Sequence, residues 1–75
     1  MFGQRLRAAR KAAGQKQEEL GQAIGIGKAQ ISGMERGTSS TTLEKLSLIC
    51  QLYNISADYL LGLTDEPKPY KRKKK

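Results

Sequence analysis

The chain has 75 residues and a net charge of +7, and it contains one cysteine and no histidine. A chain of this length forms one small domain that buries only about 60% of its unfolded surface, so a dimer would be a natural source of added stability. The absence of histidine excludes hydrolases that need an imidazole base and zinc sites with histidine ligands, and we expect no catalytic residue, no metal and no cofactor.

The positive charge is unevenly distributed along the chain. Residues 1–41 carry seven basic and three acidic side chains, a net charge of +4, whereas residues 42–67 carry a net charge of −3 and residues 68–75 a net charge of +6. A domain polarised in this way can present one face to phosphates and another to a protein partner.

The cysteine and the apolar runs indicate a cellular compartment. Cys50 cannot form an intrachain disulfide, which suits a reducing cytoplasm. Its place on the apolar side of a helical pattern favours a small buried side chain over a reactive thiol. No apolar run approaches the roughly 20 residues of a membrane span, and Met1 leads directly into an amphipathic pattern. We therefore expect a cytoplasmic protein with no membrane partner.

The first predicted helix covers about residues 2–13, because its apolar residues recur three and four positions apart. Its expected inner face consists of Phe2, Leu6, Ala9 and Ala13. Gly14 ends it, since a glycine readily adopts the left-handed conformation that follows many helices.

The second and third predicted helices, about residues 17–24 and 28–35, flank a glycine turn at Gly25. The expected buried stripes are Leu20, Ala23 and Ile24 on one helix, and Ile31 and Met34 on the next. The remaining side chains of the third helix then share an exposed face: Lys28, Ala29, Ser32 and Gly33. Two short helices in this arrangement form a helix-turn-helix, whose exposed second helix fits the major groove of duplex DNA.

The fourth predicted helix runs to about Tyr53, where Asn54 ends it. Thr41 and Glu44 have the spacing of a capping box, although Thr42 is the other candidate for the cap. The expected inner face consists of Leu43, Leu46, Ile49, Cys50 and Tyr53. Ser56 is expected to cap a short fifth helix over about residues 57–61. The fold class is therefore all-α, a compact bundle of five helices.

The segment 17–36 resembles the helix-turn-helix of the Cro and phage-repressor (Xre-like) proteins, and the resemblance covers roughly residues 2–64. Further landmarks match at the ends of three helices: Arg10-Lys11-Ala12-Ala13-Gly14, Glu35-Arg36-Gly37 and Tyr53-Asn54-Ile55-Ser56. We expect residues 1–64 to form a DNA-binding domain of this type. Residues 65–75 contain Pro67, Pro69 and a run of five basic residues. They are expected to be a disordered tail, either a solubilising end or an arm that adds phosphate contacts.

The resemblance implies which residues contact DNA. Positions that read base edges in the family correspond to Lys28, Ala29, Ser32 and Gly33. Lys28 could donate to guanine or merely contact a phosphate, and Gly33 offers no side chain. Positions that hold the phosphate backbone correspond to Lys16, Gln17, Arg36, Thr38, Ser39 and Ser40. For Gln17, the alternative is a polar residue that faces solvent without contacting DNA.

The resemblance also implies a structural ion pair between Arg10 and Glu35, which joins the first helix to the end of the third. A dimer interface is expected near the fifth helix, where the apolar side chains exceed the needs of one small core: Ile55, Tyr59, Leu61 and Leu63. The expected function is a repressor that binds a near-palindromic DNA operator as a homodimer, with no small-molecule substrate. The alternatives are an antitoxin that regulates its own promoter and a protein-interaction module.

Overall fold

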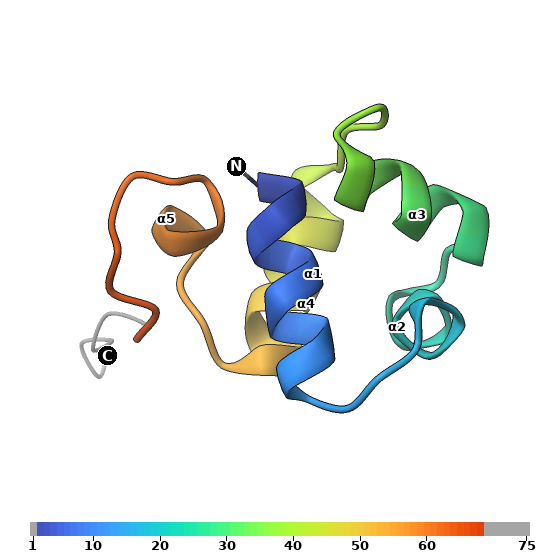
Figure 1. The fold of residues 1–75 in the computed structure, drawn as a ribbon, viewed down its shortest axis with the longest axis horizontal. Coiled ribbons are helices and arrows are strands. Elements are labelled where there is room, and N and C mark those ends of the chain that lie inside the picture. Colours follow the sequence, from blue (N-terminus) through green and yellow to red (C-terminus); the bar gives the residue numbers. More distant parts are fainter. Residues whose placement is uncertain (1, 69–75) are drawn as a thin grey trace.

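The computed structural model describes residues 2–68, which form five helices joined by short turns (Figure 1). No strand occurs within this range, so the predicted all-α, five-helix fold is confirmed. The predicted disordered tail covers residues 65–75, of which residues 69–75 lie outside the described part. No helix among the described residues is long and apolar enough to cross a membrane. The helices are α1 (Phe2–Ala12), α2 (Gln17–Ile24), α3 (Lys28–Arg36), α4 (Leu43–Tyr53) and α5 (Ala57–Leu60).

Every helix contributes apolar side chains to one core. The α3 helix packs against both α1 and α2, whereas α5 packs against α1 and α4, so that α3 and α5 lie at opposite ends of the molecule (Figure 1). The buried core residues are Leu6, Leu20, Ile24, Ile31, Met34, Leu46, Ile49 and Leu60. The outer side of α3 does not belong to this core, so this side remains available for contacts with a partner.

Three predicted core residues are exposed instead, and each has a local reason. Ala13 lies beyond the end of α1, beside Gly14 with its positive φ of 72°. Ala23 is exposed because α2 turns Leu20, Gly21 and Ile24 inward, which leaves Ala23 at the edge of that face. Leu43 is the first residue of α4 and emerges from an exposed loop, where 85% of its surface is accessible.

The helix ends follow the polar and glycine residues of the sequence. Thr42, not Thr41, caps α4: its side-chain oxygen accepts a hydrogen bond from the backbone N–H of Lys45 at 3.1 Å. Asn54 ends α4 in the left-handed conformation, with φ 54°, and the Ser56 hydroxyl caps α5, as predicted. Small differences in length remain, since α1 ends at Ala12, α3 extends to Arg36 and α5 ends at Leu60.

The segment after α5 folds back onto the bundle. The guanidinium of Arg5 donates to the Thr64 carbonyl at 2.6 Å and pairs with the Asp65 carboxylate at 2.8 Å. The carbonyl of Pro67 accepts a hydrogen bond from the backbone N–H of Ser56 at 2.9 Å. The folded domain therefore extends at least to Pro67, beyond the predicted boundary at residue 64.

Gly3 allows α1 to approach the backbone at the end of α3. A Cβ atom placed on Gly3 would lie 2.5 Å from the carbonyl oxygens of both Met34 and Glu35. These atoms belong to the backbone and cannot rotate away, so any larger residue would push α3 from its place. The close approach helps to fix the position of α3 on the bundle.

We predict that Gly3→Ala destabilises the domain by about 1–3 kcal/mol, because the added methyl group overpacks the contact between α1 and α3. Helix propensity alone predicts the opposite, a gain of up to about 1 kcal/mol. Urea denaturation followed by circular dichroism measures the difference, and Gln4→Ala, an exposed substitution on the same helix, is the control. A Gly3→Ala variant as stable as the wild type, or more stable, would refute the close contact.

Candidate nucleic-acid interface

The α3 helix buries one side and exposes the other. Ile31 and Met34 are buried to within 1% of their surface, and the Glu35 side chain is buried beside them. The side chains of Lys28 and Ala29 in the first turn are exposed. This separation gives α3 an outward face of small and polar side chains, which is the shape that a helix needs to enter a groove of duplex DNA.

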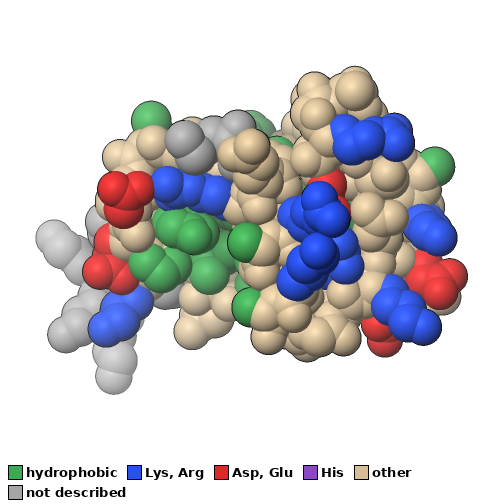
Figure 2. All heavy atoms as spheres, viewed as in Figure 1, with side chains coloured by type: hydrophobic (Ala, Val, Ile, Leu, Met, Phe, Trp, Pro, Cys, Tyr) green, Lys and Arg blue, Asp and Glu red, His purple; other side chains and the backbone are tan. Residues whose placement is uncertain are grey.

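Positive charges surround this outward face. Lys28 lies at the start of α3 and Arg36 at its end, and Lys16 precedes α2; all three are exposed. Figure 2 shows Lys and Arg side chains over α1 and on the side of α2 and α3, whereas hydrophobic side chains gather toward α5. A surface of this charge attracts phosphates before any specific contact forms.

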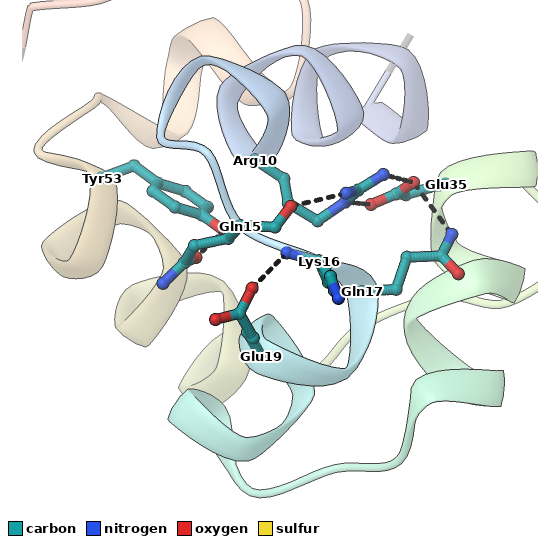
Figure 3. Close-up of polar contacts among 7 residues, drawn as sticks. All are labelled: Arg10, Gln15, Lys16, Gln17, Glu19, Glu35 and Tyr53. Carbon is teal, nitrogen blue, oxygen red and sulfur yellow. Dashed lines mark hydrogen bonds and ion pairs between the residues drawn. The ribbon is translucent and has the colours of Figure 1, made fainter.

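A buried ion pair fixes the inner side of α3. Arg10 on α1 donates from Nε to Oε2 of Glu35 at 2.6 Å and from Nη2 to Oε1 at 3.1 Å (Figure 3). The predicted pair is thus present as a two-pronged contact, the strong form of an Arg–carboxylate interaction. The hydrogen bond with Glu35 raises the pKa of Arg10, although burial opposes this.

The carboxyl group of Glu35 is held in its charged form. Burial alone would raise its pKa, but hydrogen bonds from Arg10 and Gln17 and the positive charges of Arg10 and Arg7 outweigh burial. The pKa of Glu35 therefore lies below its ordinary value. A group with a lowered pKa in the folded state stabilises the fold above its unfolded pKa, and the stabilisation is lost as the pH falls through the folded pKa.

The ion pair extends into a network that joins four helices (Figure 3). The Gln17 amide at the start of α2 donates to Glu35 Oε1 at 3.2 Å. Arg10 also donates to the Gln15 carbonyl at 2.8 Å, and the Tyr53 hydroxyl of α4 donates to Oε1 of Gln15 at 2.6 Å. The side-chain amide of Gln17, which was expected to hold a phosphate, is therefore directed at Glu35 instead. This helix end presents outward the backbone N–H groups of the first turn of α2.

The start of α2 has its own cap. The backbone N–H of Lys16 donates to Oε1 of Glu19 at 2.7 Å, which fixes the entry of the chain into the helix. This contact leaves the exposed side chain of Lys16 free of any role in the cap. The arrangement places a flexible positive charge beside the first turn of α2 (Figure 3).

Gly33 does not face the groove as predicted. It is buried because the loop after α3 folds back over it, with Ser39 and Thr38 next to the place where a side chain would begin. The helical spacing correctly placed residue 33 on the side away from the core, but periodicity within α3 contains no information on where the next loop lies. Gly33 is therefore corrected from a base-contacting residue to a residue covered by the protein itself.

The structure separates the other predicted site residues into two groups. Those expected to contact DNA lie on α3, at the start of α2 and in the loop after α3: Lys16, Gln17, Lys28, Ala29, Ser32, Arg36, Thr38, Ser39 and Ser40. The residues expected at a dimer interface lie on and around α5: Ile55, Tyr59, Leu61 and Leu63. Leu61 and Leu63 expose 49% and 73% of their surfaces, whereas Ile55 and Tyr59 are half-buried.

Sequence reasoning missed two residues with long-range contacts, of which Gly3 positions α3 and Arg5 holds the segment after α5. Gly3 and Arg5 both act through partners more than 30 residues away in the chain. The Arg5 guanidinium also lies 4.3 Å from the centre of the Tyr59 ring, a cation–π contact. A glycine and an arginine within an amphipathic helix give no local signal of such partners, so their roles emerge only from the packed structure.

We predict that Glu35→Gln lowers the free energy of unfolding by about 3 kcal/mol at neutral pH, because it leaves the buried charge of Arg10 without its counter-ion. The deficit should shrink as the pH falls from the ordinary pKa of a glutamate through the lowered pKa of folded Glu35, since the wild-type carboxyl group is neutral below that lowered pKa. Urea denaturation over a series of pH values measures both effects.

Glu44→Gln serves as the matched control. Glu44 is exposed and its carboxylate lies 3.7 Å from Lys45 Nζ, so its loss should cost less than about 1 kcal/mol. Equal stability losses in the two variants, or a Glu35→Gln deficit independent of pH, would refute the proposed weight of the buried pair.

The geometry can now be compared with known proteins. The family model described as helix-turn-helix matches residues 6–60. The P22 c2 repressor in complex with synthetic operator 9T has a similar structure, with a TM-score of 0.76 and 33% sequence identity; the match covers 80% of this chain and 91% of that chain.

Two curated relatives differ in their described roles. The uncharacterized HTH-type transcriptional regulator YobD of Bacillus subtilis (strain 168) is 45% identical over 69 residues, and antitoxin PezA of Streptococcus pneumoniae serotype 4 (strain ATCC BAA-334 / TIGR4) is 34% identical over 62 residues. These matches cover 92% and 83% of this chain but only 62% and 39% of the relatives, so the chain spans less than two thirds of either relative. The chain belongs to the helix-turn-helix family, in its Cro and phage-repressor (Xre-like) group, whose members are DNA-binding regulators and not enzymes.

Proposed function

We propose that this protein binds double-stranded DNA in a sequence-specific manner and represses transcription as a homodimer on a near-palindromic operator. The observation that carries the proposal is the outward face of α3. Its inner side is held by Ile31, Met34 and the Arg10–Glu35 pair, while Lys28 and Ala29 face away from the protein. A rigidly held helix with a free polar side is suited to the major groove.

Two of the three residues of α3 that we propose to read bases, Ala29 and Ser32, have short side chains, which limits their contacts with base edges. Lys28 donates to guanine O6 or N7, Ala29 contacts a thymine methyl group, and Ser32 donates or accepts at a base edge. With small side chains at two of these three positions, DNA shape contributes a large share of the sequence preference.

Phosphate contacts flank the helix on both sides. On the α2 side, the phosphates are held by Lys16 and by the backbone N–H of Gln17. At the far end of α3, they are held by Arg36, Thr38 and Ser40. These contacts fix the register of the protein on the duplex but do not read sequence. They predict a strong salt dependence, with log K falling by about 0.9 per phosphate neutralised in a plot against log salt.

The apolar residues around α5 form the dimer interface in this proposal. Leu61 and Leu63 follow α5 and are exposed, and Ile55 and Tyr59, just before and within α5, are half-buried. The α5 helix lies at the end of the molecule away from α3 (Figure 1), although Leu61 also lines a hollow with Phe2 and Gly37. A two-fold dimer through this end presents two copies of α3 to successive major grooves, with half-sites one helical turn, about 34 Å, apart. Occupancy of the operator then blocks RNA polymerase.

An antitoxin function is the second candidate, because the antitoxin PezA is 34% identical over 62 residues. Both functions include binding to promoter DNA, so DNA binding does not separate them. Co-expression with the product of a neighbouring small gene does. A stable complex that relieves toxicity of that product favours the antitoxin, and the absence of such a complex favours the repressor.

A mobility-shift assay on the DNA upstream of the gene, followed by footprinting, tests the proposed function. We expect retardation at low salt and a protected site with two related halves. No retardation at low salt would instead favour a protein-interaction module with this fold.

We predict that Lys28→Ala lowers the discrimination between the selected site and scrambled DNA by about 1–3 kcal/mol, because one base contact is lost. Lys68→Ala is the matched control, since it removes one exposed positive charge next to Pro67, whose carbonyl is bonded to Ser56 at the start of α5. Fluorescence anisotropy with labelled duplexes measures both affinities. Equal losses on the two duplexes would show that Lys28 only contacts a phosphate.

We predict that Leu63→Asp shifts the protein from dimer to monomer and weakens operator binding, while the monomer stays folded, because Leu63 is 73% exposed and contributes little to the core. Sedimentation equilibrium measures the association, and thermal melting reports the fold. Leu43→Asp, at an 85% exposed leucine outside the proposed interface, is the control. Unchanged association in Leu63→Asp would place the dimer interface elsewhere.

A further inference from the structure

One position on the outward side of α3, between Ala29 and Arg36, has no side chain. Gly33 lies there, one turn after Ala29 and on the side opposite Ile31. A glycine inside a helix is unfavourable compared with alanine, so its presence calls for a reason in the packing. The reason is the loop that follows α3.

The loop is fastened to the backbone of Gly33. The carbonyl oxygen of Gly33 accepts hydrogen bonds from the backbone N–H groups of Thr38 at 2.9 Å and Ser39 at 3.2 Å. It also accepts one from the hydroxyl of Thr38 at 3.2 Å. Gly37 makes this return possible with a φ of 83°, in the left-handed region. The loop therefore lies against the outer side of α3 in a defined position.

The hydroxyl of Ser39 occupies the space that a side chain at position 33 would enter. A Cβ atom placed on Gly33 would lie 2.5 Å from Ser39 Oγ and 3.2 Å from Ser39 Cβ. Ser39 is exposed, and within residues 2–68 its hydroxyl has no hydrogen-bond partner. A serine hydroxyl can both donate and accept, so it can bond to a base edge.

We propose that Ser39 is a specificity-determining residue that supplies, from the loop, the base contact which α3 lacks at position 33. The inference rests on the proposed DNA-binding function and changes the expected role of Ser39 from a phosphate contact to a base contact. The hydroxyl of Thr38 is engaged by the Gly33 carbonyl, so Thr38 positions the loop. A larger residue at position 33 would force the Ser39 hydroxyl to move from its place beside α3.

The test begins with the wild-type protein and a library of duplexes randomised over about two helical turns. The selected duplex and its single-base-pair variants are then titrated with wild type, Ser39→Ala and Ser47→Ala by fluorescence anisotropy. Ser47→Ala removes an exposed serine hydroxyl of α4 and is the matched control. Ser39→Ala should lose about 2- to 12-fold of preference at one base pair in each half-site, the value of one hydrogen bond, and retain its affinity for scrambled DNA. Ser47→Ala should retain the full profile.

Gly33→Ala provides a second, independent variant. Its methyl group meets Ser39 Oγ and forces the hydroxyl to move, so the preference should change at the same base pair as in Ser39→Ala. The double variant should show no further loss at that base pair, because both substitutions remove one contact. A change at a different base pair would overturn the inference. Circular dichroism melting verifies that each variant is folded.

The remaining outcomes distinguish the inference from the function on which it rests. Equal weakening of selected and scrambled DNA by Ser39→Ala would make Ser39 a phosphate contact and overturn the inference, with the DNA-binding proposal intact. An unchanged profile in Ser39→Ala would overturn it in the same way. If the wild-type protein selected no sequence from the library, the proposed function would fail and the inference with it.

Discussion

The buried ion pair between Arg10 and Glu35 joins parts of the domain that are distant in the sequence. It connects the last turn of α1 to the last turn of α3, and the Gln17 amide extends it to the first turn of α2. Two charges taken out of water are tolerable only when their remaining hydrogen-bonding groups are satisfied. The Gln15 carbonyl meets that requirement for Arg10, and no buried side-chain polar atom in residues 2–68 lacks a partner. The orientation of α3 depends on this network and on the close approach at Gly3.

The outer side of α3 carries exposed side chains, in contrast to the inner side with its buried ion pair. The large apolar side chains of this helix are turned inward, and what faces out is Lys28, Gln30 and Arg36, small side chains and a glycine covered by a loop. Such a face gives close backbone approach to a duplex but few long side chains to read it. The exposed apolar residues near α5, at the opposite end of the molecule, suit a second copy of the chain. In a dimer, two copies of α3 would contact the DNA, which would compensate for the small number of base contacts that each copy can make.

The sequence predicts what depends on neighbouring residues and misses what depends on distant ones. The five helices and the glycine and asparagine at their ends follow from spacing and from local backbone preferences, and these predictions are confirmed. Arg10 and Glu35 could be paired only through the resemblance to a family, because no local rule joins residues 25 positions apart. Other features depend on how the helices pack against one another. Ser39 covers Gly33, and Arg5 holds the segment after α5. The exposure of Leu43 and Ala23 has the same origin. Periodicity within one helix contains no information on such contacts.

The central claim is that the outward face of α3 and the segments on either side of it contact the duplex. The most direct measurement is a titration of isotope-labelled protein with the selected duplex, followed by backbone amide resonances. We expect the large shifts to be confined to the start of α2, to α3 and to the loop at residues 37–40. Large shifts confined to α4 and α5, with the amides of α3 unchanged, would contradict it.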